Sequence, residues 1–217
     1  LLGSIPTQLG NLTALERLNL RNNLLTGGIP AEIGNLSSLL GLELRHNQLD
    51  GAIPAELGNL PLLQHLDLGD NQLSGNLPTE LGSLTYMILL DLGGNLLDGN
   101  LPAWFSNMTQ LVYLGLERND FSGPIPPEIG YLTNLDFINL SENNLTGSLP
   151  VELANLTNLV ELYLSDNDLT GGLPAWIGSL SQLRLLHVAQ NSLTGPIPSE
   201  LGTVTSLEQL YLRGNMF

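Results

Sequence analysis

The sequence of 217 residues has no cysteine and no lysine, and its six arginines are outnumbered by 21 acidic residues, which gives a formal net charge of −15. Without cysteine the chain has no disulfide framework, no thiolate metal ligand and no thiol nucleophile. A chain so poor in cations lacks the basic patches that bind nucleic-acid phosphates or anionic lipids. No apolar run approaches the ~18 residues of a membrane-spanning helix. We therefore expect neither nucleic-acid binding nor direct membrane contact from this segment.

Glycine, proline and asparagine are abundant, and each recurs with a spacing of 24 residues. One series of glycines starts at Gly3, one of prolines at Pro6 and one of asparagines at Asn23, each with nine members. Seven further positions of the repeat hold only Leu, Ile, Val, Met or Phe. Such a fixed period is typical of stacked-repeat proteins. Because the length is nine periods plus one residue, residues 1–217 are predicted to form a single array of nine repeats.

The first part of each repeat is predicted to form a strand and an inward turn. Leu18 and Leu20 alternate with period two, which indicates a short strand with one buried face, and copies stacked at ~4.8 Å form a parallel sheet. Asn23 follows this strand, and one amide per coil can satisfy turn groups that water does not reach. The predicted ladder of structural asparagines comprises Asn23, Asn47, Asn71, Asn95, Asn119, Asn143, Asn167, Asn191 and Asn215.

The second part of each repeat is predicted to form a tight turn and a short helix. Thr26-Gly27 indicates a turn in which glycine permits a positive φ. Pro30 is predicted to fix φ in the first helical turn, with Glu32 near the positive end of the helix and Gly34 ending it. Each coil contributes seven apolar side chains to a core that it cannot close alone, so nine coils form a rod or arc about 43 Å long.

The segment Leu15–Pro30, LERLNLRNNLLTGGIP, matches position by position the repeat of the plant-type leucine-rich-repeat family, and the resemblance covers all 217 residues. That family includes receptor-kinase ectodomains, receptor-like proteins and polygalacturonase-inhibiting proteins, and similar 24-residue arrays occur in algal and protist Roco-type proteins. The resemblance implies an α/β solenoid wound as a right-handed superhelix, with a concave parallel β-sheet and short 3₁₀ turns on the convex side. It also implies cysteine-bridged caps in extracellular members. Because such capping motifs are missing, we expect a fragment of a longer protein whose uncapped ends self-associate.

Function is expected where the coils differ, which is on the solvent-facing strand positions. Apolar and aromatic residues gather at these positions on successive strands: Leu89, Tyr113, Phe137, Tyr163, His187 and Tyr211. An exposed run of this kind is typical of a protein-binding surface, and the alternative is a set of ordinary surface aromatics that favour β-strands. A second patch is acidic, with Glu43, Asp67 and Asp91 on adjacent strands. These carboxylates are predicted to repel one another, so that some of their pKa values rise unless a cation screens them, and Arg45, two residues from Glu43 on the same face, is a candidate for such screening. The patch indicates either a basic ligand or a solvated acidic face.

Catalytic sites are not indicated. His65 and Asp67 share a face, but no serine or cysteine stands beside them as a nucleophile, and no histidine pair has the spacing of a metal site. We therefore expect no enzyme activity and no cofactor. Trp104 and Trp176 replace the helix glutamate, which favours packing over the next coil, with lateral association as the alternative.

Five glycosylation sequons stand at Asn11, Asn35, Asn107, Asn144 and Asn155, mostly as a by-product of the repeat itself. Localisation is therefore open: the family favours a cell surface, whereas the missing cysteines permit a cytosolic array. The favoured interpretation is a protein- or peptide-recognition module, the ligand-binding part of a receptor or an immune-type sensor, that binds through the concave face. The alternatives are an intracellular scaffold attached to a GTPase or kinase, and a structural or adhesive module.

Overall fold

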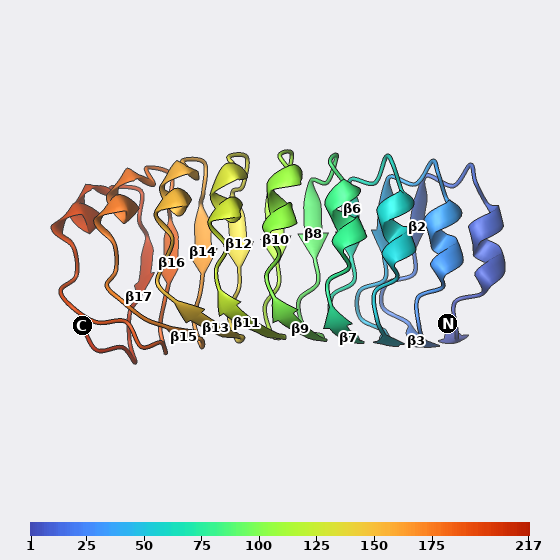
Figure 1. Cartoon of the computed structure of the whole chain (residues 1–217), viewed down its shortest axis with the longest axis horizontal. Helices are drawn as coiled ribbons and strands as arrows, with labels where there is room; N and C mark the ends of the chain where they lie inside the picture. The colour runs from blue at the N-terminus through green and yellow to red at the C-terminus, as the bar shows by residue number, and fades with distance from the viewer.

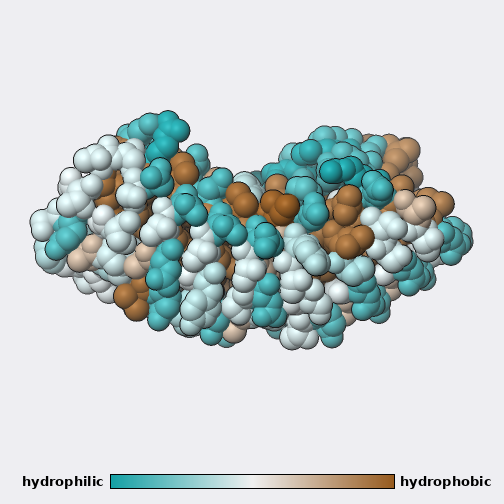
Figure 2. Space-filling model, turned by 90° about the horizontal axis from the view of Figure 1, so that it is seen from above, coloured by the Kyte–Doolittle hydropathy of each residue, from teal (hydrophilic) through white to brown (hydrophobic).

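The computed structural model describes all residues, 1–217, as a curved stack of coils that advances steadily from the N-terminus to the C-terminus (Figure 1). A typical coil runs through one strand of a large sheet, one strand of a small sheet and one short 3₁₀ helix. The predicted α/β solenoid is confirmed. Seen from above, the molecule is an arc, and its hollowed side is the face of the large sheet (Figure 2).

The large sheet has nine parallel strands in the order β17-β16-β14-β12-β10-β8-β6-β4-β2. Each residue pairs with the residue 24 positions further on, as Tyr113 does with Phe137, so equal repeat positions form straight columns across the sheet. The strands are β2 (Arg17–Asn19), β4 (Gly41–Glu43), β6 (His65–Asp67), β8 (Leu89–Asp91), β10 (Tyr113–Gly115), β12 (Phe137–Asn139), β14 (Glu161–Tyr163), β16 (Leu185–His187) and β17 (Gln209–Tyr211).

The small sheet has eight parallel strands, and each lies around the glycine turn of its coil. Here the register advances by 22 residues per coil, as between Ser122 and Asn144, so neighbouring strands are staggered by two residues relative to the large sheet. The strands are β1 (Leu2–Gly3), β3 (Leu24–Gly27), β5 (Gln48–Gly51), β7 (Gln72–Asn76), β9 (Leu96–Asn100), β11 (Asp120–Pro124), β13 (Asn144–Gly147) and β15 (Asp168–Leu169).

Short 3₁₀ helices line the convex side. They are η1 (Thr7–Asn11), η2 (Ala31–Asn35), η3 (Ala55–Asn59), η4 (Thr79–Ser83), η5 (Ala103–Asn107), η6 (Pro127–Tyr131), η7 (Val151–Asn155), η8 (Ala175–Ser179) and η9 (Ser199–Thr203). Two details differ from expectation. Pro30 has an extended ψ of 134° and lies just before η2, not within its first turn. Gly34 does not end η2; it is required because a Cβ there would collide with the backbone of Glu56 on the next coil.

The core is one continuous cluster of 54 buried apolar residues that runs along the whole stack. The asparagine ladder seals it on the side where each coil turns inward. The amide of Asn119 donates to the carbonyl oxygens of Leu92 (3.1 Å) and Leu116 (3.2 Å), and its Oδ1 accepts the N–H of Leu97 at 3.0 Å. One side chain therefore joins two coils, and from Asn47 to Asn215 the other members repeat this pattern.

Candidate ligand-binding face

Five rings cross the large sheet as a continuous aromatic run. Tyr113 and Phe137 are stacked with ring centroids 4.3 Å apart and an interplanar angle of 2°. Phe137 and Tyr163 are 5.7 Å apart and tilted by 46°, which is where the run passes from the first to the third position of the strand. His187 continues it edge-on at 6.2 Å from Tyr163, and Tyr211 follows at 4.8 Å. Leu89 pairs directly with Tyr113 and extends the run toward the N-terminus.

The rings are held in place by polar neighbours of their own strands. The Tyr163 hydroxyl donates to Glu161 at 2.9 Å, and the Tyr211 hydroxyl donates to Gln209 at 2.9 Å. Burial, together with the nearby Glu161 carboxylate, raises the pKa of Tyr163 to about 12. Burial lowers the pKa of His187, so this ring is neutral at pH 7 and behaves as part of an apolar surface. Brown, hydrophobic atoms are visible in the hollow among teal and white ones (Figure 2).

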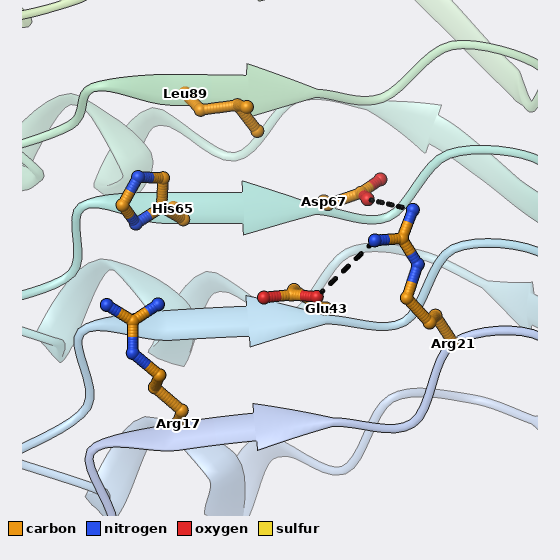
Figure 3. A pocket seen from close by; sticks show the side chains of 6 residues that line it. All are labelled: Arg17, Arg21, Glu43, His65, Asp67 and Leu89. Carbon is orange, nitrogen blue, oxygen red and sulfur yellow. Dashed lines mark ion pairs between the residues drawn. The ribbon is translucent and has the colours of Figure 1, made fainter.

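The acidic patch lies at the N-terminal side of this run, beside a pocket of ≈ 270 Å³ lined by Arg17, Arg21, Glu43, His65, Asp67 and Leu89 (Figure 3). Arg21 reaches over the sheet and pairs with Glu43 at 3.6 Å and with Asp67 at 3.8 Å. Glu43 also accepts the Asn19 amide at 2.6 Å. The pocket therefore contains both signs of charge.

Arg45 is the centre of the acidic patch. Its guanidinium pairs with Asp91 and, at 2.6 Å, with Asp70, and it lies 4.0 Å from Asp67. Asp67 and Asp91 are only 8% and 5% exposed. The expectation that they face solvent is therefore corrected, because each is covered and neutralised by an arginine. Their pKa values are raised as expected, but the main cause is burial; repulsion by Asp91 comes second at Asp67, and repulsion by Asp70 is a minor cause at Asp91.

Glycines create the room for these long arginine contacts. Gly69 lies on the coil between Arg45 and Asp91, and a Cβ there would press on the Arg45 guanidinium. Arg118 extends in the opposite direction, toward the N-terminus. Its Nη2 lies 2.6 Å from Asp70 Oδ1 and passes close to Gly94. Arg45 and Arg118 thus span two coils each and strap together the segment from residue 45 to residue 118.

Beside these straps lies a carboxylate that sequence reasoning did not single out. Glu117 lies over Gly93, and its Oε2 is buried without a hydrogen-bond partner. Burial raises the pKa of Glu117, with a smaller contribution from Asp91.

A left-handed residue in every coil also escaped the sequence pattern. The position before each ladder asparagine has a positive φ, although only two of the nine residues are glycine. The residues are Asn22, His46, Asp70, Gly94, Arg118, Glu142, Asp166, Gln190 and Gly214. The two glycines and the recurring Asn and Asp were the available signal, since these types tolerate left-handed backbone best.

The five predicted sequons are all exposed or half-buried, and four of them end a 3₁₀ helix while Asn144 lies in β13. A sixth tripeptide, Asn139-Leu140-Ser141, was missed because it lies in β12, away from the repeat's own Asn-Leu-Thr position. Asn139 pairs with Gly115 and Tyr163, in the middle of the concave face. Its Oδ1 accepts the N–H of Ser141 at 3.1 Å.

Other expectations concern the convex side and the ends. Trp104 is half-buried against the core and also lies against Gly82 of the preceding coil. Phe217, expected in the core, is 39% exposed, as are Leu1 and Leu2 at 71% and 81%. No helix is long and apolar enough to span a bilayer. No group of three or more histidine or acidic side chains is placed to hold a metal ion.

Comparisons with known proteins agree with this architecture. The family model described as "Leucine-rich repeat region" matches residues 89–215, and the model "Leucine rich repeat" matches residues 13–73. No curated protein sequence matches the chain.

Several solved structures share the fold over almost the whole chain. The ectodomain of the Arabidopsis receptor kinase HAESA, in complex with an N-terminally extended IDA peptide hormone, is 39% identical with a TM-score of 0.94, over 99% of this chain and 36% of that chain. The Arabidopsis thaliana receptor kinase GASSHO1/SCHENGEN3, in complex with CASPARIAN STRIP INTEGRITY FACTOR 2, is 36% identical with a TM-score of 0.84, over 99% and 28%. A plant ice-binding protein is 30% identical with a TM-score of 0.84, over 99% and 69%.

The chain spans about a third of the length of the receptor ectodomains that it resembles. The larger of the two family matches covers more than half of the chain, and the fold and the 24-residue period are those of the same family. This protein therefore belongs to the leucine-rich-repeat family, in its plant-type form.

Proposed function

We propose that this chain is the ligand-binding array of an extracellular receptor or immune-type sensor, and that it holds a peptide or protein on its concave face. The observation that supports this most is the aromatic run, because five rings in mutual contact lie across the outer face of the large sheet. The receptor ectodomains among its structural relatives were solved with peptide ligands, which favours the same use here. The proposal assigns the chain recognition and not catalysis.

Within this proposal Leu89, Tyr113 and Phe137 are the anchors, and Tyr163, His187 and Tyr211 extend the contact. Glu43 contributes at the N-terminal rim. Asp67 and Asp91 act indirectly, because their charges are already paired with Arg21 and Arg45. An intracellular scaffold next to a GTPase or kinase, or an adhesive module, would use the same fold without needing these exposed rings.

A displayed library of random dodecapeptides, selected on the intact chain, tests the site. Affinities of the selected peptides are then measured by surface binding kinetics for the parent chain and its variants. Phe137→Ala and Tyr113→Ala are expected to cost about 2 kcal/mol or more, because buried aromatic anchors dominate such interfaces. Glu80→Gln on the convex helix η4 is the control and should change nothing. If the selected peptides bind both aromatic variants with unchanged affinity but lose affinity for the convex variant, the site lies elsewhere.

A further inference from the structure

The acidic residues of the concave side differ in whether an arginine neutralises them. On the N-terminal half, Glu43, Asp67, Asp70 and Asp91 each pair with an arginine. Beyond residue 120, the only ion pair joins Arg184 to Glu208. Glu16 and Glu117 have no ion pair, but Glu16 lies on the first coil, and Glu117 is half-buried with its Oε2 enclosed. The accessible, unpaired acidic residues next to the aromatic run therefore lie toward the C-terminal end, and not at the acidic patch that the sequence emphasised.

Two carboxylates on this side flank an aromatic ring. Asp136 immediately precedes β12, and Glu161 begins β14, where it pairs with Phe137. Asp136, Phe137, Val160 and Glu161 line a pocket of ≈ 150 Å³. Tyr113 on β10 stacks on one face of the Phe137 ring, and Tyr163 on β14 lies 5.7 Å away at a tilt of 46°. Phe137 therefore lines the pocket with the part of its ring that these two neighbours leave uncovered.

The polar groups around the pocket offer negative charge and no positive charge. Glu161 accepts the Tyr163 hydroxyl through Oε2 at 2.9 Å, which leaves Oε1 free. The cation on the next coil, Arg184, is turned away, with Nε 2.9 Å and Nη2 2.7 Å from Glu208. Burial is the main cause of the raised pKa of Asp136, and repulsion by Glu161 adds to it, as expected for a carboxylate without a cation beside it.

We infer that this pocket receives a lysine or arginine side chain of the ligand. The Glu161 and Asp136 carboxylates hold the charge, and the side-chain stem lies against Phe137 and Val160. A cation held by these carboxylates beside Phe137 is also attracted by the ring itself. The inference rests on the proposed function and deepens it: the ligand is a chain segment with a basic residue next to the apolar residues that contact Tyr113 and Leu89. A ligand with an acidic residue at this point would be repelled by both carboxylates.

The same dodecapeptide library provides the test. The sequences of the selected peptides are determined, and their affinities are compared between the parent chain and variants that lack acidic side chains. The double variant Asp136→Asn/Glu161→Gln removes both charges, and the new glutamine amide can still accept the Tyr163 hydroxyl. The matched control, Glu128→Gln/Glu152→Gln, removes two charges from the convex helices η6 and η7. Selected peptides should contain Lys or Arg beside apolar residues. They should lose roughly tenfold or more in affinity on the concave double variant and less than about twofold on the convex one.

The outcomes separate this inference from the proposed function. If the peptides lose affinity on Phe137→Ala but contain no basic residue, or bind the concave double variant as tightly as the parent, the basic subsite is refuted and concave recognition stands. If Phe137→Ala leaves the affinity of the peptides unchanged, both the basic subsite and concave recognition are refuted. If both double variants weaken binding equally, the effect is one of overall charge, and the pocket has no specific role. Replacing the basic residue of a selected peptide by norleucine should reproduce the loss caused by the concave double variant.

Discussion

Replacement of one ladder asparagine should cost far more than its small volume suggests. In Asn119→Ala the N–H of Leu97 loses its acceptor. The carbonyl oxygens of Leu92 and Leu116 each lose one of two amide donors, because Asn95 still donates to Leu92 and Asn143 to Leu116. Asn119 is 7% exposed, so water does not reach these groups without opening the coil. An unpaired buried polar group costs about 1–3 kcal/mol, and the orphaned Leu97 N–H therefore sets the expected loss at about 1–3 kcal/mol.

The control for this variant needs an exposed asparagine with ordinary backbone. Asn22, which precedes the ladder residue Asn23, is exposed but has a φ of 57°. Asn22→Ala would itself cost about 1–2 kcal/mol through left-handed backbone, and so it is not a neutral comparison. Asn144 is exposed, lies in β13 without a positive φ, and makes no side-chain hydrogen bond of its own, so Asn144→Ala serves instead.

Two measurements check this prediction. Urea unfolding compares the two alanine variants, and amide hydrogen exchange follows Leu97 directly, which avoids assuming that a repeat array unfolds in one step. Asn119→Ala should lower the midpoint strongly and expose Leu97 to exchange before the rest of β9 (Leu96–Asn100). The reasoning is refuted if Leu97 stays protected, or if Asn144→Ala is equally costly.

Three further predictions use other features of the fold. Glu142→Gly should raise stability by about 0.5–1 kcal/mol in urea unfolding, because Glu142 has a φ of 54° and glycine relieves that strain, whereas Glu152→Gly in η7 should lower it. Burial raises the pKa values of Asp67, Asp91 and Glu117 above those of the unfolded chain, so the folded chain binds protons more tightly. This contribution to stability is lost as pH rises from the unfolded values of about 4 through the raised folded ones. The urea midpoint should therefore be higher near pH 4 than at pH 7, and Glu117→Gln should reduce that difference. Light scattering of the 217-residue chain should show association that increases with concentration, through the exposed apolar residues at its ends; a strict monomer contradicts this.

The fold was predictable because every structural requirement recurs in the sequence with the same period. Leu18 and Leu20 indicate the strand, Asn23 the inward turn and Gly27 the positive φ, and nine copies leave no ambiguity of register. Even so, the repeat misled at Pro30 and Gly34. Their residue types are typical of a helix start and a helix end, whereas Gly34 is needed for contact between coils, which a single repeat does not reveal.

The aromatic run was predictable in its members but not in its geometry, because the stacking of Tyr113 on Phe137 depends on rotamers. The acidic patch was misjudged for a different reason. Arg45 reaches Asp91, 46 residues away, and no pattern within a repeat or between adjacent repeats indicates a contact two coils away. The missing side chains at Gly69 and Gly94 were a local hint that long side chains cross this part of the sheet.

The arginine straps also have a mechanical consequence. Under tension along its axis, a solenoid extends like a spring, and each coil yields according to how firmly it is joined to its neighbours. The coils from residue 21 to residue 118 are joined twice, by the core and by contacts that skip a coil, whereas the coils on their C-terminal side depend on nearest neighbours alone. Under tension the C-terminal half would therefore extend more than the N-terminal half. That half holds most of the aromatic run, so pulling on the chain would separate its rings while the strapped coils kept their pitch.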